Sequence, residues 1–358
     1  MFLIEFLSST GIVLTVIFIL FTVIYFLILF ILLFRIFENI RVEQKKNFIE
    51  RHENHIFRYI VEDISPKEIV KLIPKSSYQS LLEHLRPLFL NLKGEDKKKL
   101  NALVNETPLF DYLMEELNSF NKKRIRFGAY YLGLSESLTA KLPLLKKMKM
   151  GDEFVFITTA LSLARLNAID SLNDILSEAK RYEDISQDTI LNILYEFDET
   201  VCEKLLLHLN HDASSNVKSL IITTLRHFKY VPAAPVVLNI LIDEKDTGVI
   251  VDALLYFGDI EYTDAANTVR FYLINARPEI KIAAIKAAEK VGASNLQNKI
   301  WDLLYDKNRF VKVTAANALF DYSENSRKDL EQLAYRLPST MESSIARMLI
   351  SQKTIHLN

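Results

Sequence analysis

Few side chains in this sequence have the types and the spacing that catalysis or metal binding requires. Two of the seven histidines, His208 and His211, form an HxxH pair, which could hold zinc only with ligands from elsewhere in the chain. The single cysteine, Cys202, excludes an internal disulfide framework, and a lone cysteine is usually a small apolar core residue. No Gly-rich phosphate loop, nucleophile elbow or paired-carboxylate arrangement occurs. We therefore expect no enzyme activity, no catalytic residue, no metal site and no cofactor.

The composition favours long helices and gives no sign of a nucleic-acid partner. The 44 Lys and Arg residues balance 45 Asp and Glu residues, so the chain has no strong overall field. Only eight Gly and nine Pro occur among 358 residues, which leaves few of the turn signals that a many-stranded β protein needs. We expect an all-α protein that does not bind nucleic acid.

The N-terminal segment predicts a membrane anchor. Residues 11–34 contain no charge, and a helix of this length rises about 36 Å, enough to span the lipid bilayer. A cleaved signal peptide is the alternative, but no alanine precedes Ala102, so a small-residue cleavage site is missing. Only Glu5 precedes the run, whereas five basic residues follow it: Arg35, Arg41, Lys45, Lys46 and Arg51. The positive-inside rule then predicts a single-pass protein of the cell membrane whose C-terminal part lies in the cytoplasm.

The rest of the chain divides into three predicted parts after the anchor at residues 1–34. Residues 35–64 are expected to form a juxtamembrane helix, which ends at Ser65-Pro66. Residues 65–121 are expected to be a divergent N-terminal helical cap, with helices at Tyr78–Leu92 and Leu109–Phe120 separated by the charged segment Gly94–Lys99. Residues 122–358 form a repeat region.

Self-similarity with a period near 31 residues is the most informative feature of this region. One apolar column runs through seven predicted helices: Leu132, Leu163, Leu194, Leu225, Leu254, Ala288 and Leu319. The positions three residues before and after each member are also apolar, with the exception of Ser135, as one buried helix face requires. Shorter amphipathic stretches lie between these helices, at Cys202–Leu209, Val236–Ile242, Leu296–Tyr305 and Leu330–Leu337. Each period therefore predicts two antiparallel helices.

This pattern resembles the HEAT-repeat family, in which an aspartate turn is followed by a helix with an aliphatic residue, a basic residue and alanine-rich apolar positions. The best matches are the segments Asp306 to Leu319, Asn275 to Ala288 and Asp212 to Leu225. The resemblance implies a right-handed α-solenoid of about seven or eight helix pairs in an armadillo-type fold. HEAT-like hydroxylases bind two irons through repeated His-Glu pairs, but His-Glu occurs here only once, at His52-Glu53. HEAT-like DNA glycosylases use a basic, aromatic-rich cleft, and the single tryptophan, Trp301, is more simply a core residue.

The resemblance also implies that the second helices line a concave face, which is the best candidate surface for a partner. Eight residues fall on or beside it: Arg126, Tyr130, Arg165, Lys218, Arg226, Lys281, Lys286 and Lys312. Ordinary surface charge would explain each of them, but together they suggest a mildly basic groove for an acidic peptide or anionic headgroups. We expect that reversing the charge of Lys218, Arg226, Lys281 and Lys312 together leaves the fold intact and weakens partner capture.

These features predict a membrane-tethered, cytoplasm-facing adaptor that docks or regulates a membrane-associated enzyme or transport assembly. Its partners would be proteins in the same membrane, and the bilayer itself would be contacted through residues 11–34. Membrane-anchored bacterial HEAT proteins that act beside envelope polysaccharide machinery are one conceivable analogy. Two alternatives stay open: an enzyme with a cryptic pocket in the solenoid, and a structural protein that binds anionic lipid.

Overall fold

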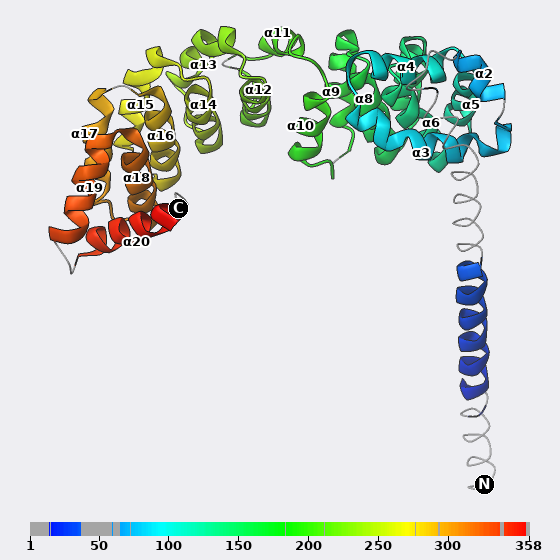
Figure 1. The fold of residues 1–358 in the computed structure, drawn as a ribbon, viewed down its shortest axis with the longest axis horizontal. Helices are drawn as coiled ribbons and strands as arrows, with labels where there is room; N and C mark the ends of the chain where they lie inside the picture. Colours follow the sequence, from blue (N-terminus) through cyan, green and yellow to red (C-terminus); the bar gives the residue numbers. More distant parts are fainter. Residues whose placement is uncertain are drawn as a thin grey trace. The chain divides into compact units, whose positions relative to one another are not determined.

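The computed structural model describes residues 14, 16–36, 59, 65–71, 73–182, 184–210, 212–275, 277–292, 294–336 and 340–355. Within these ranges the secondary structure is helical and contains no strand, which confirms the all-α prediction (Figure 1). The predicted juxtamembrane helix lies outside the described residues except for Arg35, Ile36 and Tyr59, and so does His211.

The first described helix, Val16–Ile36, is long and apolar enough to cross a membrane (Figure 1). It has 21 residues and a mean hydropathy of 3.3, and none of its most apolar stretch is buried inside the structure. Its one described polar contact is internal, because the Thr22 hydroxyl donates to the Phe18 carbonyl oxygen at 2.8 Å. Most of the predicted span at residues 11–34 is therefore helical, whereas residues 11–13 and Thr15 lie outside the described part.

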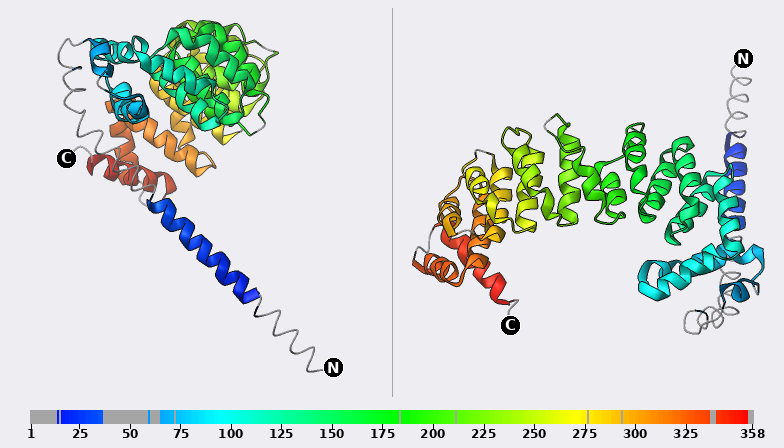
Figure 2. Two further views of the ribbon diagram at one scale, coloured as in Figure 1. Left: turned by 90° about the vertical axis from the view of Figure 1, so that its right-hand side faces the viewer. Right: turned by 90° about the horizontal axis from the view of Figure 1, so that it is seen from above.

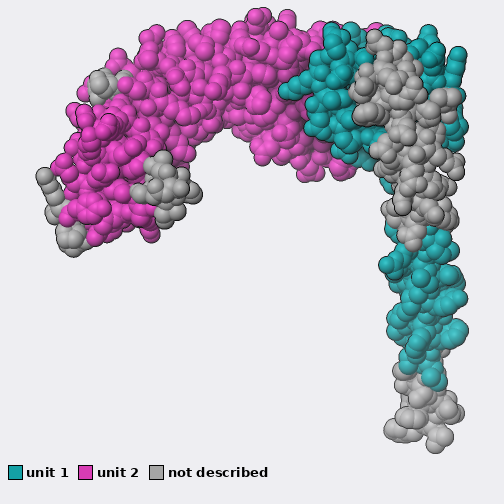
Figure 3. Space-filling model, viewed as in Figure 1, with its two compact units in different colours: residues 1–140 teal, residues 141–358 magenta. Residues whose placement is uncertain are grey.

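The chain forms two compact units, residues 1–140 and residues 141–358 (Figure 3). Unit 1 contains, after the N-terminal helix, α2 (Pro66–Lys71), α3 (Tyr78–Asn91), α4 (Gly94–Asn105), α5 (Pro108–Asn118) and α6 (Lys122–Leu134), with short 3-10 turns η1 (Lys75–Ser77) and η2 (Leu138–Ala140). The first predicted repeat helix, α6, thus belongs to unit 1, where it packs on α3 and α5.

The charged segment Gly94–Lys99 begins a helix and does not separate two helices as predicted. Glu95 and Asp96 occupy the first turn of α4, where negative charge is favourable beside the unpaired backbone N–H groups. Its apolar residues Leu100, Leu103 and Val104 come only in the second half of α4, and all three are fully buried. The charge run therefore forms the first turns of the helix, and the apolar half attaches it to the core.

Unit 2 is a series of helix pairs (Figure 2). Its helices are α7 (Lys141–Met150), α8 (Glu153–Arg165), α9 (Leu172–Ala179), α10 (Gln187–Tyr195), α11 (Val201–Leu206), α12 (Ser215–His227), α13 (Ala234–Leu241), α14 (Thr247–Asp259), α15 (Ala266–Leu273), α16 (Pro278–Val291), α17 (Ser294–Leu303), α18 (Arg309–Tyr322), α19 (Glu324–Arg336) and α20 (Met341–Ile355), with 3-10 turns η3 (Ile169–Ser171), η4 (Val231–Ala233) and η5 (Thr263–Ala265). Each even-numbered helix from α8 to α18 packs on the next even-numbered helix. The second helices of successive pairs therefore form one continuous row.

Several second helices end with the same backbone geometry. Glu136, Asn167, Lys229 and Glu261 each follow such a helix in the left-handed region, with φ between 49° and 53°. The N–H of the next residue donates to a carbonyl one turn back inside the helix at 3.0 to 3.1 Å, and the four acceptors are Leu132, Leu163, Leu225 and Phe257. This is the Schellman arrangement, which satisfies carbonyls that a helix end leaves open. A glycine, Gly292, occupies the left-handed position after α16.

These helix ends correct the predicted apolar column in α14. The residue equivalent to Leu225 is Phe257, whereas the sequence prediction chose Leu254. Both side chains are fully buried and lie three residues apart on one face, so apolar spacing could not distinguish them. Ser135, the polar member of a flanking column, is also fully buried, and its hydroxyl donates to the Tyr131 carbonyl oxygen at 2.8 Å. The hydrogen bond removes the cost of an unpaired buried hydroxyl.

Candidate functional site

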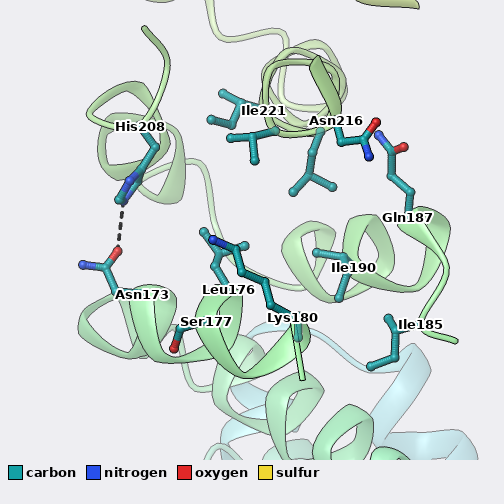
Figure 4. A pocket seen from close by; sticks show the side chains of 13 residues that line it. Asn173, Leu176, Ser177, Lys180, Ile185, Gln187, Ile190, His208, Asn216 and Ile221 are labelled. Atoms are coloured by element: carbon teal, nitrogen blue, oxygen red, sulfur yellow. Dashed lines mark hydrogen bonds between the residues drawn. The ribbon is translucent and has the colours of Figure 1, made fainter. Parts of the chain in front are cut away.

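An apolar cleft of about 430 Å³ opens in unit 2 among α9, α10, α12 and the turn after α11 (Figure 4). Its floor consists of aliphatic side chains: Leu176, Ala179, Ile185, Ile190, Val217, Leu220 and Ile221. Its polar members are Asn173, Ser177, Lys180, Gln187, His208 and Asn216. An apolar floor with a few polar groups around it is the usual composition of a ligand-binding pocket, and this volume lies in the usual range of about 300–1,000 Å³.

Local chain geometry explains why the cleft lies here. The second helix of this pair, α10, has nine residues, whereas α12 and α14 each have 13. Its start is fixed by Ser186, whose side chain accepts a hydrogen bond from the Thr189 N–H at 3.2 Å. Residues 180–182 and 184–186 lie outside the helices, and a full-length neighbour does not fill the space beside α12.

One hydrogen bond joins two walls of the cleft. The His208 ring donates from Nε2 to Oδ1 of Asn173 at 3.0 Å, which links the turn after α11 to α9 (Figure 4). His208 thus has a structural partner, while His211 lies outside the described residues. Among the described residues, no three His, Cys, Asp or Glu side chains come together as a metal-binding group.

Five of the six predicted basic residues of unit 2 are engaged in ion pairs between successive helix pairs. Arg165 of α8 contacts Glu196 at 2.8 Å, Lys218 of α12 contacts Glu244 at 2.9 Å, and Lys281 of α16 contacts Asp306 at 2.5 Å. The same pattern continues in the pairs Arg226 with Asp259 and Lys312 with Glu342. Their sequence separations of 25 to 33 residues correspond to one repeat. Each cation therefore joins one helix pair to the following one.

The environment of the acids shows that these pairs are structural. Burial alone would raise the pKa of Glu244, but hydrogen bonds from the backbone of Asp246 and from the Lys218 ammonium lower it below its ordinary value. Burial likewise opposes ionisation of Asp259 and Asp306, yet hydrogen bonds from neighbouring Lys side chains lower both pKa values. A hydrogen bond from Lys312 lowers the pKa of Glu342.

This pairing overturns the expectation that the basic row is freely exposed. Side chains of Lys218, Lys281 and Lys312 are only 10%, 18% and 12% exposed, and their charges are compensated within the chain. Reversing them would place two carboxylates together in a partly buried site, which is strongly unfavourable. Partner binding by the row stays a prediction, but reversing four of its members together would also destabilise the fold.

The remaining predicted residues occupy different settings. Arg126 and Tyr130 lie on α6 in unit 1 and are half-buried, and the Tyr130 hydroxyl accepts a hydrogen bond from Arg86 Nε at 3.0 Å. Lys286 lies on α16 and is exposed. Trp301 on α17 is half-buried and therefore only partly a core residue. The eight residues do not share one environment.

A polar and aromatic group between α10, α12 and α14 was not anticipated from the sequence. The Ser219 hydroxyl on α12 donates to Asp252 on α14, and burial raises the pKa of Asp252 above its ordinary value. The rings of Tyr195 and His227 stack with their centres 3.9 Å apart. The residues involved lie on different helix pairs, so no local motif announced them.

Cys202, the single cysteine, belongs to the core as predicted. It is fully buried in α11, and burial raises its pKa to about 12, so the thiol is protonated at neutral pH. A protonated, buried thiol is a poor nucleophile.

Large apolar side chains are exposed at equivalent places in successive helix pairs of unit 2, and we call these five residues the apolar edge. Each stands at the end of a first helix, directly after or near the last buried residue: Leu207, Ile242, Ile274, Tyr305 and Tyr335, between 61% and 73% exposed. Singly exposed apolar residues are ordinary, but their recurrence at the same place in successive helix pairs makes them a candidate contact surface. Most of these positions fall in the predicted amphipathic stretches, but apolar spacing alone does not reveal which of their residues face solvent.

The search for similar proteins gives no family assignment. No protein family matches the sequence, and no curated protein is significantly similar to it. The HEAT resemblance therefore depends on the repeated columns of the sequence alone.

Proposed function

We propose that this chain is a membrane-anchored binding scaffold: a HEAT-type α-solenoid, held at the cytoplasmic side of a membrane, that docks or regulates a membrane-associated enzyme or transport assembly. The observation that carries the proposal is the continuous row of second helices from α8 to α20, together with the recurring helix ends at Asn167, Lys229 and Glu261. In such a repeat protein each pair adds a strip of surface, and the usual work of an extended surface is to hold another macromolecule.

The membrane part of the proposal is supported by the helix Val16–Ile36. Its side chains are exposed and apolar, which is stable in a bilayer and unfavourable in water. The basic residues that follow the span favour the cytoplasm for everything C-terminal to it. A tether also raises the effective concentration of any partner in the same membrane.

A binding role is supported by where the unusual groups lie. The cleft among α9 to α12 and the exposed apolar edge are accessible surfaces. Cys202 and Asp252, whose pKa values are raised, do not line the cleft. Accessible apolar surface without an adjoining activated nucleophile favours recognition over catalysis.

Site-specific photo-crosslinking in living cells tests this proposal with the full chain. A photoreactive amino acid would replace Ile274 or Tyr305 on the apolar edge, with the exposed Lys286 of α16 as a comparison position. We expect adducts with one or a few membrane proteins, which weaken when residues 1–34 are deleted because the tether is lost.

The outcomes separate the candidate functions. Adducts with lipid alone at all positions would favour a lipid-binding structural protein, and an absence of adducts at every position would overturn the scaffold proposal. A reporter that is active only in the cytoplasm, fused after residue 358, should be active. Activity confined to a reporter that works outside the cytoplasm would refute the orientation.

A further inference from the structure

The rim of the cleft among α9 to α12 offers hydrogen bonds of a particular kind. Three primary amides, Asn173, Gln187 and Asn216, line it and are exposed (Figure 4). A primary amide both donates and accepts hydrogen bonds, as does each unit of a peptide main chain. An acyl chain has no such groups along its length, so it would make no hydrogen bonds with amides placed around an aliphatic floor.

The charge of the rim is one-sided. Lys180 is exposed, and the described lining residues include no other lysine and no arginine, aspartate or glutamate. A lone ammonium beside an apolar floor favours a ligand with a carboxylate next to its apolar part. An acidic ligand would meet no acidic side chain among those lining residues.

The floor sets the apolar part of the ligand. Ile185 and Val217 are half-exposed, and Ile190 and Leu220 retain 8% exposure at the base of the cleft. A cavity of about 430 Å³ accommodates a few aliphatic side chains and not a folded domain. The hydrogen bond between His208 and Asn173 joins two walls of the cleft.

From these features we propose that the cleft binds a short segment of a partner protein in which aliphatic side chains stand beside an acidic residue. The inference rests on the proposed scaffold function and names the chemistry of its partner. Aliphatic side chains of the segment occupy the floor, its main chain meets the amides, and its carboxylate lies by Lys180.

A phage-displayed library of random heptapeptides, selected against the purified full chain, tests the proposal. We expect enriched peptides that combine aliphatic residues with Asp or Glu. Their binding should weaken roughly three- to tenfold in Lys180→Glu, because a rim charge contact is worth up to about 1 kcal/mol and reversal adds repulsion. Peptides that carry Lys in place of the acidic residue should bind the Lys180→Glu variant more tightly than they bind the wild-type chain.

Two further variants test whether the effect of Lys180→Glu is specific to the cleft. Lys286→Glu makes the same charge change on α16, and its binding should equal that of wild type. Ile185→Ser, which shortens a half-exposed floor residue, should weaken every enriched peptide and leave the helical circular-dichroism signal unchanged.

The possible failures are distinct from those of the scaffold proposal. No aliphatic and acidic enrichment, or equal effects of Lys180→Glu and Lys286→Glu, would overturn the cleft proposal even where crosslinking from Ile274 captures a membrane protein. Binding of oleate in the cleft without peptide enrichment would assign it to lipid and overturn the peptide proposal as well. Peptide enrichment without any crosslinked partner would instead leave the cleft in place and refute the scaffold role.

Discussion

Replacing Lys218 by methionine should destabilise unit 2 by about 2–3 kcal/mol, although a surface lysine would normally tolerate this change. The ammonium lies 2.9 Å from Glu244, and the two side chains are only 10% and 8% exposed. Two opposite charges at this distance attract by about 6 kcal/mol at an effective dielectric constant of about 20, and their desolvation offsets much of this.

The expected loss is smaller than the ~3–5 kcal/mol typical of breaking a buried pair, because Glu244 keeps other partners. Its Oε1 accepts hydrogen bonds from the backbone N–H groups of Lys245 and Asp246, both at 2.9 Å. For a unit of this size, 2–3 kcal/mol corresponds to a decrease in Tm of roughly 4–12 °C.

Denaturant unfolding of the full chain, followed by circular dichroism, measures this effect. A double-mutant cycle with Glu244→Gln should give a coupling free energy of about 1–3 kcal/mol, because the glutamine can still accept both backbone hydrogen bonds. Lys286→Met is the matched control: it removes an exposed lysine from the next-but-one second helix and should change stability by less than about 0.5 kcal/mol.

The pH dependence has a definite sign. The pKa of Glu244 is lower in the folded chain than its ordinary 4.5, so the stability that the pair contributes is present above that value and is lost as pH falls through the folded pKa. Wild type and Lys218→Met should therefore converge in acid. Equal stabilities of Lys218→Met and Lys286→Met at neutral pH, with no coupling to Glu244, would refute the structural role of the pair.

Three other changes test the packing and the helix ends by thermal unfolding. Gly128→Ala should cost about 1–3 kcal/mol, because the added Cβ would lie 2.6 Å from the Leu113 carbonyl oxygen and force α5 and α6 apart; an unchanged Tm would contradict this close approach. Lys229→Gly should stabilise the chain by roughly 0.5–1 kcal/mol, whereas Lys229→Val should destabilise it, because only glycine adopts a φ of 50° without strain; the reverse order would refute the left-handed helix end. Asp252→Asn should raise Tm at neutral pH, because burial raises the pKa of Asp252 and disfavours its charged form. The stability that the neutral carboxyl contributes is present below the ordinary pKa of 3.8 and is lost as pH rises. The difference in Tm between Asp252→Asn and wild type should therefore disappear in strong acid.

The sequence by itself determined the local features of this protein. The apolar helix at residues 11–34 could be predicted without any knowledge of tertiary contacts, because length and composition alone decide whether a helix can cross a bilayer. The helices of the repeat region were also predictable, since the apolar residues of a buried helix face recur every three or four positions within one continuous segment. Leu132, Leu163 and Leu225 are accordingly all fully buried.

Only the tertiary structure decided how these helices meet. The pairing of Lys218 with Glu244 or Lys281 with Asp306 joins residues 25 or 26 positions apart, and a charge pattern does not reveal whether a lysine faces water or the acid of the next helix pair. The choice of Phe257 over Leu254 depended on where α14 ends, which backbone hydrogen bonds define and apolar spacing does not.

The cleft is the clearest case of a feature that emerges only in three dimensions. Its residues come from three helices and two turns between Asn173 and Ile221, and no short segment of the sequence contains more than a few of them. A local pattern reports which face of a helix is apolar, whereas a cavity is the volume that several such faces fail to fill. Its shape therefore depends on the lengths and relative positions of α9, α10 and α12 and of the turns between them, which no single stretch of sequence contains.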